Sequence, residues 1–327
     1  MATPSPDFMP LGVAGLRVTR LCFGTGTLFR LHSSRERQRL LDAAFDLGIR
    51  HFDTARSYGL GDAERELGKF LARHRDDVTV ATKFGMRVSS TGRLLKPLQT
   101  AARRVVGMFP GLRKQLRKRP LPIVAPRCFD LASARESLET SLRELAVERI
   151  DMLFLHEPDE RAQIDPGLAD WLAASRDAGL VSTWGLSGPL ANILPVRSAH
   201  PGLAEVLQYA SDAVKRPTDA PGPRLTYSPF ASALEPVLAA VDVSPAAAAR
   251  WRAMVDLPPD RNTVAGLLLA DACGGPAPCP VVFSTTRVRH LESLVQAAYD
   301  PEMQTRVPAF RQWITTQLPP AVKEQAS

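Results

Sequence analysis

The sequence is poor in cysteine, with four in 327 residues, and no two of them form a Cys-x-x-Cys pair. Scattered cysteines without neighbouring histidines exclude a zinc site of the usual spacing, and they are typical of a reducing cytoplasm. The chain also lacks an apolar run of about 18 residues, the length that a membrane-spanning helix needs. Its first ten residues, MATPSPDFMP, have neither the basic nor the apolar part of a secretory signal. We therefore expect a soluble cytoplasmic protein without a metal site.

Acidic residues are missing from one long stretch. Between positions 87 and 127 there are eleven Lys and Arg side chains and no Asp or Glu, whereas the whole chain carries +7, so the remaining residues carry −4. Apolar residues at helical steps predict two short amphipathic helices here, broken at Pro110 and Gly111.

Three roles for this basic insertion stay open. It can be a lid or wall that adds positive potential to a substrate pocket, a face that contacts an anionic membrane surface, or a solvated excursion without function. Its one aromatic residue, Phe109, offers too little stacking for nucleic acid, so we expect no nucleic-acid partner.

Short apolar runs alternate with amphipathic stretches along the rest of the chain, which is typical of βαβ units and a parallel sheet. The length suits one (β/α)8 barrel, so we expect a single domain over residues 1–327 with an insertion at about 87–127, after the third strand. The sixth helix should be shortened, because the stretch between Tyr209 and Arg224 is brief and contains three prolines. The predicted strands are 19–24, 51–54, 78–83, 151–156, 183–187, 205–209, 224–228 and 281–284.

Four polar side chains form a candidate catalytic group: Asp53 and Tyr58 in HFDTARSYG, Lys83 in VTVATKFG and His156 in MLFLHEP. Hydride reduction of an aldehyde or ketone leaves an alkoxide that needs a proton, and a tyrosine hydroxyl can be the general acid. A lysine ammonium beside it stabilises the phenolate that forms. A buried lysine needs a counter-charge, which Asp53 supplies, and His156 is the candidate for polarising the carbonyl oxygen.

The segments around these residues resemble the aldo-keto reductases, over residues 16–28, 40–70, 150–158, 183–189 and 225–230. YGLGDAERELG is more similar to the bacterial aldose-dehydrogenase-like branch than to the aldose-reductase branch. The resemblance implies an eightfold β/α barrel, the same group of four catalytic residues and a nicotinamide cofactor bound without a Rossmann domain. The sequence itself agrees on the last point, because Gly24-Thr25-Gly26 is followed by Phe29 where a dinucleotide fingerprint needs a third glycine.

The resemblance also implies which residues contact the nicotinamide half of the cofactor. Backbone at Gly24 and Thr25 would approach the ribose, Ser187 and Gln208 would hold the carboxamide, and Tyr227 would stack on the ring. Gly188 departs from the pattern, because the family commonly has asparagine at this position.

The adenosine half would follow two further segments. Ser228, Pro229 and Phe230 would continue into the pyrophosphate site, and Ser284, Thr285 and Thr286 would meet the adenosine phosphate at a helix N-terminus. Arg289, or alternatively Arg287, would contact a 2′-phosphate, with Glu292 as half of the family's usual Glu-Asn pair. These residues favour NADPH over NADH.

We therefore expect an enzyme that reduces a small-molecule carbonyl with NADPH. One alternative is an NAD(P)-dependent dehydrogenase that oxidises a sugar or another secondary alcohol. A second is a non-catalytic, cofactor-sensing subunit that binds a partner protein through the basic insertion. No motif indicates an oligomeric state or one particular substrate.

Overall fold

The computed structural model describes residues 5–11, 13, 15–86, 127–217, 220, 222–274 and 278–318. The basic insertion predicted at 87–127, with its two amphipathic helices, lies outside the described residues except for Arg127.

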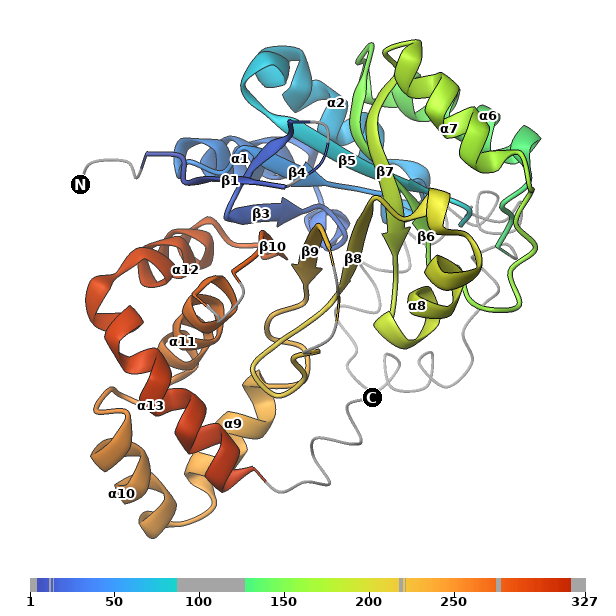
Figure 1. Cartoon of the computed structure of the whole chain (residues 1–327). Coiled ribbons are helices and arrows are strands. Elements are labelled where there is room, and N and C mark those ends of the chain that lie inside the picture. The colour runs from blue at the N-terminus through green and yellow to red at the C-terminus, as the bar shows by residue number, and fades with distance from the viewer. Residues whose placement is uncertain are drawn as a thin grey trace, which may run out of the picture.

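Eight parallel strands close into a barrel, so the predicted (β/α)8 fold is confirmed (Figure 1). Each strand overlaps one of the predicted ranges. In the barrel β10 lies between β9 and β3, and the other strands follow one another in chain order. The strands are β3 (Leu21–Gly24), β4 (His51–Asp53), β5 (Thr79–Phe84), β6 (Ile150–His156), β7 (Val181–Ser187), β8 (Val206–Ala210), β9 (Arg224–Tyr227) and β10 (Val281–Phe283).

Helices cover the outside of the barrel (Figure 1). The α-helices are α1 (Ser34–Asp46), α2 (Ala63–His74), α6 (Leu131–Leu145), α7 (Leu168–Asp177), α8 (Leu190–Ala199), α9 (Leu234–Asp242), α10 (Pro245–Met254), α11 (Arg261–Cys273), α12 (Val288–Tyr299) and α13 (Pro301–Gln317). Short 3-10 helices are η1 (Leu28–Arg30), η2 (Tyr58–Gly61), η3 (Arg75–Asp77) and η4 (Pro201–Leu203).

The local sequence explains where these helices begin and which face they bury. A capping box between Ser33 and Glu36 starts α1, and the Asp130 side chain accepts a hydrogen bond from the Ser133 N–H at the start of α6. On the strands, alternate residues face opposite sides. Phe52 of β4 points outward and packs on Phe70 of α2, with ring centroids 4.6 Å apart.

The first predicted strand, 19–24, was wrong in its extent. The barrel strand begins at Leu21, whereas Arg17–Thr19 forms β2 and pairs antiparallel with β1 (Phe8–Pro10). Where the chain changes partner, the Thr19 hydroxyl donates to the Leu21 carbonyl at 2.7 Å. The hairpin carries Val18 into the same apolar cluster as the barrel side chains Ala81 and Met152.

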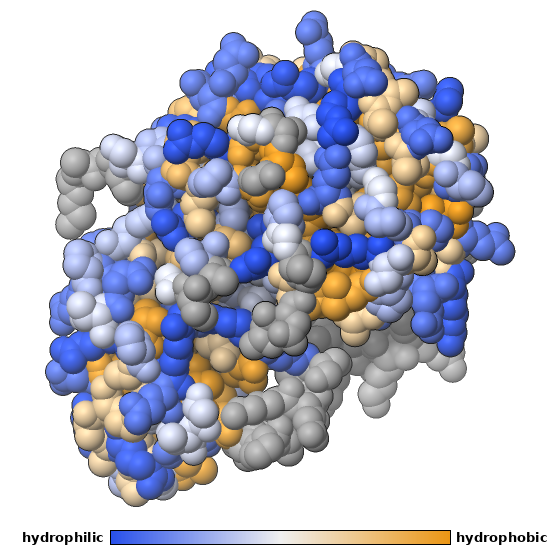
Figure 2. All heavy atoms as spheres, in the orientation of Figure 1, coloured by the Kyte–Doolittle hydropathy of each residue, from blue (hydrophilic) through white to orange (hydrophobic). Residues whose placement is uncertain are grey.

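Between β8 and β9 the described residues contain no helix, which confirms the shortened sixth helix. Beyond β9, a second apolar cluster joins α9, α10, α11 and α13 around Trp251, Phe310 and Trp313. Its two tryptophan rings meet edge to face, with centroids 5.0 Å apart. On the face seen in Figure 2, polar side chains predominate over α1, α2 and α6, and apolar ones are interspersed among them over α10 and α13.

None of the helices in the described ranges has the length and apolar character needed to cross a bilayer. Within the same ranges, no three His, Cys, Asp or Glu side chains are grouped so that they could hold a metal ion.

Candidate active site

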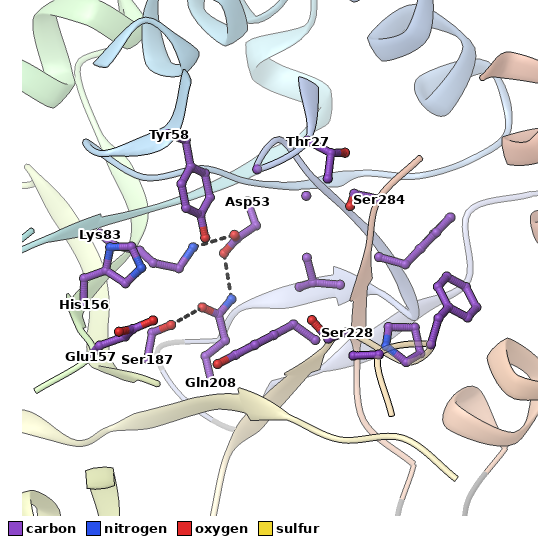
Figure 3. A pocket seen from close by; sticks show the side chains of 18 of the residues that line it. Thr27, Asp53, Tyr58, Lys83, His156, Glu157, Ser187, Gln208, Ser228 and Ser284 are labelled. Carbon is purple, nitrogen blue, oxygen red and sulfur yellow. Dashed lines mark hydrogen bonds and ion pairs between the residues drawn. The ribbon is translucent and has the colours of Figure 1, made fainter. Parts of the chain in front are cut away.

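The four predicted catalytic side chains lie together at the carboxyl ends of the barrel strands (Figure 3). Asp53 ends β4, His156 ends β6, Lys83 is the penultimate residue of β5, and Tyr58 opens η2 just after β4. The carboxyl ends of parallel strands form one face of a barrel, so residues distant in the sequence meet there. Asp53, Lys83 and His156 are 4%, 2% and 6% exposed, which places the group inside the protein rather than on its surface.

Lys83 is the centre of this group. Its Nζ donates to Asp53 Oδ1 at 2.5 Å and to the Thr54 carbonyl at 2.9 Å, and it lies 5.1 Å from the centre of the Tyr58 ring. Burial is the largest single influence and lowers the pKa of Lys83, but Asp53 and Tyr58 together outweigh it and raise this pKa above its ordinary value. Lys83 therefore stays a cation next to the tyrosine hydroxyl.

The backbone after Tyr58 fixes the position of its ring. Gly59, Leu60 and Gly61 all have positive φ, a turn that glycine adopts without strain. A Cβ at Gly59 would lie 2.4 Å from the Phe29 ring, so a side chain there would displace the turn. Burial raises the pKa of Tyr58 and the Lys83 ammonium opposes that rise, so the hydroxyl stays protonated at neutral pH and can donate.

His156 lies edge to face with Tyr58, with ring centroids 5.8 Å apart. Burial, with smaller contributions from Lys83 and Arg127, lowers the pKa of His156 to about 3. The imidazole is therefore neutral at physiological pH. A neutral ring can donate one N–H to a carbonyl oxygen without itself being an acid that competes with Tyr58.

Ser187 and Gln208, the two residues expected to hold the cofactor carboxamide, are connected to the catalytic residues by hydrogen bonds. The Ser187 hydroxyl donates to Gln208 Oε1 at 2.6 Å, and Gln208 Nε2 donates to Asp53 Oδ2 at 2.7 Å (Figure 3). A continuous chain of hydrogen bonds thus runs from Ser187 in β7 through β8 and β4 to Lys83 in β5, which lies beside Tyr58. The sequence placed all of its members but did not indicate the bond between Gln208 and Asp53.

The four catalytic candidates line a pocket of about 550 Å³. Most of the predicted cofactor residues line the same pocket: Gly24, Ser187, Gln208, Tyr227, Ser228, Pro229, Phe230 and Ser284. Thr25 is instead buried behind the wall, where its hydroxyl bonds the Asp53 carbonyl at 3.1 Å and the Thr54 hydroxyl at 2.8 Å. The other four predicted residues follow β10 and lie outside the pocket lining: Thr285, Thr286, Arg289 and Glu292.

Sequence reasoning missed seven residues of the lining: Gly26, Thr27, Arg30, Glu157, Ala231, Val282 and Phe283. Most of them lie at or just beyond the carboxyl end of a barrel strand or next to a residue that was chosen. A rule that includes the positions after each strand would have found Thr27 and Glu157. Glu157 follows His156 directly and adds a carboxylate to the pocket.

The departure at Gly188 has a steric explanation. A Cβ at this position would lie 3.0 Å from the Glu157 Cα and 3.3 Å from Ile193 Cγ2. The asparagine that the family commonly has at this position would therefore push against the backbone of Glu157. The observed position of Glu157 therefore requires a residue without a side chain at position 188.

A second histidine lies buried in β4. Burial is the main reason that the pKa of His51 falls to about 4 from 6.5, and its Nδ1 is 2.8 Å from the Thr79 hydroxyl. In the folded protein both His51 and His156 are therefore neutral at physiological pH.

Their neutral state predicts acid sensitivity. As the pH falls below 6.5 the unfolded chain takes up protons that the folded chain does not. The free energy of unfolding should therefore decrease from about pH 6.5 toward about pH 4, by up to about 1.4 kcal/mol per pH unit for each histidine. Urea denaturation at several pH values measures this slope.

The His51→Asn variant should show a smaller slope of unfolding free energy against pH. The control variant His290→Gln, at an exposed histidine, should show an unchanged slope. An equal slope in His51→Asn and the wild type would show that His51 is not responsible.

A model of the Aldo/keto reductase family matches residues 20–203. A D-threo-aldose 1-dehydrogenase of a Pseudomonas species is 36% identical over 188 residues, which are 55% of this chain and 53% of that protein. A pyridoxal 4-dehydrogenase of Microbacterium luteolum is 30% identical over 176 residues, 52% of this chain and 48% of that protein. The chain thus spans about half the length of the curated relatives it matches.

A solved structure shares the whole architecture. The holo form of an aldo-keto reductase from Bacillus halodurans aligns with a TM-score of 0.63 at 17% identity, covering 93% of this chain and 95% of that one. At such low identity the likeness shows the fold alone.

Proposed function

Because the chain belongs to the aldo/keto reductase family, we propose that it is a nicotinamide-dependent oxidoreductase that reduces an aldehyde or ketone to an alcohol, with NADPH as the hydride donor. The observation that carries the proposal is the buried Asp53–Lys83 ion pair with Tyr58 beside it and a neutral His156, all lining one pocket. These residues can deliver a proton from the Tyr58 hydroxyl to a carbonyl oxygen in the pocket, and reduction of a carbonyl requires such a proton donor from the protein.

The proton movement follows from the bonds described above. Tyr58 donates its hydroxyl proton to the carbonyl oxygen as negative charge develops there. Lys83 stabilises the phenolate that is left, and Asp53 holds Lys83 in place and in its charged state. His156, neutral, donates an N–H to the same oxygen and orients the carbonyl. In the oxidative direction Tyr58 accepts the proton instead.

The pocket residues fit a nicotinamide cofactor, which would supply the hydride. Ser187 and Gln208 still have unused hydrogen-bonding capacity after their mutual bond, so they can hold a carboxamide, and Tyr227 offers a ring for stacking. Gly24, which lines the pocket, would allow close approach of the ribose.

The remainder of the cofactor would lie along the segments that follow β9 and β10. The backbone and side chains at Ser228, Pro229, Phe230 and Ser284 would contact the pyrophosphate. We further propose that Thr285, Thr286, Arg289 and Glu292 bind the adenosine end, with Arg289 pairing with a 2′-phosphate. We also propose that residues 1–327 act as one barrel domain.

The second candidate is the reverse reaction, oxidation of a sugar at a hydroxyl-bearing carbon. It is supported by the similarity to an aldose dehydrogenase and by the carboxylate of Glu157 in the pocket wall. Both candidates use the same four catalytic residues, and they differ in cofactor and direction.

Cofactor titration followed by a substrate panel tests the proposal. Quenching of tryptophan fluorescence should show at least about tenfold tighter binding of NADPH than of NADH, because a charge-assisted pair to the 2′-phosphate contributes about 1.5 kcal/mol or more. NADPH should then be consumed with a panel of aldehydes and ketones. Preference for NAD with turnover of sugars would favour the dehydrogenase, and tight binding without turnover of any substrate would contradict both.

A further inference from the structure

The residue that follows His156 adds a carboxylate to the pocket beside the catalytic group. Glu157 lines the same pocket as Tyr58, His156 and Ser187, and Figure 3 shows its side chain next to Ser187. The four catalytic side chains already supply and stabilise the transferred proton, so the reaction does not need a further acid there. Glu157 must be explained by something other than proton transfer.

Backbone geometry indicates that this placement is specifically maintained. Glu157 has φ of +53°, in the left-handed region that side chains other than glycine rarely adopt. Its N–H donates to the Ser187 carbonyl at 2.6 Å, which joins the residue to the end of β7. Gly188 gives it room, since a Cβ there would be 3.0 Å from the Glu157 Cα. Unfavourable backbone of this kind persists where the surrounding structure holds it, and it gathers at functional sites.

Within the described part of the chain, one oxygen of the carboxylate is paired and the other is not. Arg127 Nη2 donates to Glu157 Oε2 at 2.9 Å, and Arg127 Nη1 donates to Asp159 Oδ2 at 3.2 Å. Among the described residues, Glu157 Oε1 has no hydrogen-bond donor. The side chain is half-exposed, at 37%, so this oxygen can be reached by a molecule in the pocket.

The charges around Glu157 indicate which kind of donor fits. Arg127 is paired with the carboxylate directly, and the Lys83 cation lies in the same pocket. A carboxylate already paired with arginine attracts a second cation weakly, but its free oxygen still accepts a hydrogen bond from a neutral hydroxyl. An anionic group would be repelled by the carboxylate.

We propose that Glu157 determines substrate specificity by accepting a hydrogen bond from a hydroxyl group close to the reacting carbonyl. The enzyme then prefers hydroxylated, sugar-like aldehydes, or the corresponding alcohols, over unsubstituted ones. This inference rests on the oxidoreductase function proposed above. The expected preference for the hydroxylated substrate is about 10- to 100-fold in kcat/KM, which is the general strength of a hydrogen bond to a charged group.

A ratio of two substrates tests the proposal. The kcat/KM for glyceraldehyde is divided by that for propanal, which has the same carbon chain without the hydroxyls. Glu157→Leu, which removes the acceptor, should lower this ratio about 10- to 100-fold. Glu157→Gln keeps a neutral acceptor and should lower it by an intermediate amount. Glu160→Gln is the matched control, because Glu160 is exposed and lies outside the pocket lining; its ratio should equal that of the wild type.

Each other outcome has a separate meaning. A ratio that changes less than about twofold in Glu157→Leu overturns the proposal. Equal losses for both aldehydes, together with weaker NADPH binding, would assign Glu157 to the cofactor site and also overturn it. Absence of turnover by the wild type on every carbonyl and alcohol would refute the proposed function, and the inference with it. Circular dichroism and cooperative thermal unfolding of each variant show whether a loss comes from misfolding.

Discussion

The Tyr58→Phe variant is expected to lower kcat for carbonyl reduction by about 10²- to 10⁴-fold, the usual contribution of a general acid. Phenylalanine keeps the ring that packs edge to face against His156 but has no proton to donate. Lys83 would retain its bonds to Asp53 and Thr54, so the pocket should keep its shape. Single-turnover kinetics with saturating cofactor measures the chemical step directly, and a fluorescence titration should show cofactor affinity changed by less than about threefold.

Tyr209 provides a matched control for this substitution. It is a buried tyrosine in β8 that does not line the pocket, so Tyr209→Phe removes a hydroxyl from the same barrel without removing the proton donor. It should retain most of the activity. If Tyr58→Phe also kept a third or more of the wild-type kcat, another group would have to be the acid and the assigned mechanism would be wrong.

The Lys83→Met variant should show the largest loss of stability. Lys83 and Asp53 form a buried ion pair, with side chains 3% and 5% exposed. Removing one partner leaves the other charge buried without compensation, which typically costs about 3–5 kcal/mol of unfolding free energy. Urea denaturation followed by tryptophan fluorescence measures the loss. Carbonyl reduction should fail as well, because Tyr58 loses the cation that stabilises its phenolate.

Two further variants show whether the loss comes from the unpaired charge. In Asp53→Asn/Lys83→Met both charges are removed, and the new amide oxygen can still accept from Gln208, so more than half of the lost stability should return. Arg261→Met breaks an exposed ion pair with Glu235, whose side chains are 57% and 71% exposed, and should cost less than about 1 kcal/mol. A double variant no more stable than Lys83→Met would show that lost packing, not charge, is responsible.

The barrel and the four catalytic candidates could be predicted because both depend on local patterns. Each strand is a short apolar run between amphipathic stretches, so its position is visible without knowledge of its neighbours. The carboxyl ends of parallel strands meet on one face, so assigning Asp53, Lys83 and His156 to strand ends was enough to bring them together.

The features that escaped prediction depend on contacts between distant segments. The pairing of Phe8 with Thr19 has no signal in the nearby sequence. Both strands of that hairpin have only three residues, which is too short for an alternating pattern to be recognised. The left-handed backbone of Glu157 depends on Gly188, in a different loop. The bond between Gln208 and Asp53 joins residues that a resemblance had assigned to separate tasks, cofactor binding and catalysis.

The hydrogen-bonded chain from Ser187 to Lys83, which ends beside Tyr58, affects pH–rate profiles. Gln208 is hydrogen bonded to Asp53, Asp53 is paired with Lys83, and Lys83 Nζ lies 5.1 Å from the centre of the Tyr58 ring, so removing a proton from Tyr58 changes the electrostatic surroundings of the Asp53–Lys83 pair. Groups coupled in this way release protons in macroscopic steps that belong to the set and not to one residue. An apparent pKa from such a profile would thus shift when Ser187 or Gln208 is replaced, although neither side chain titrates.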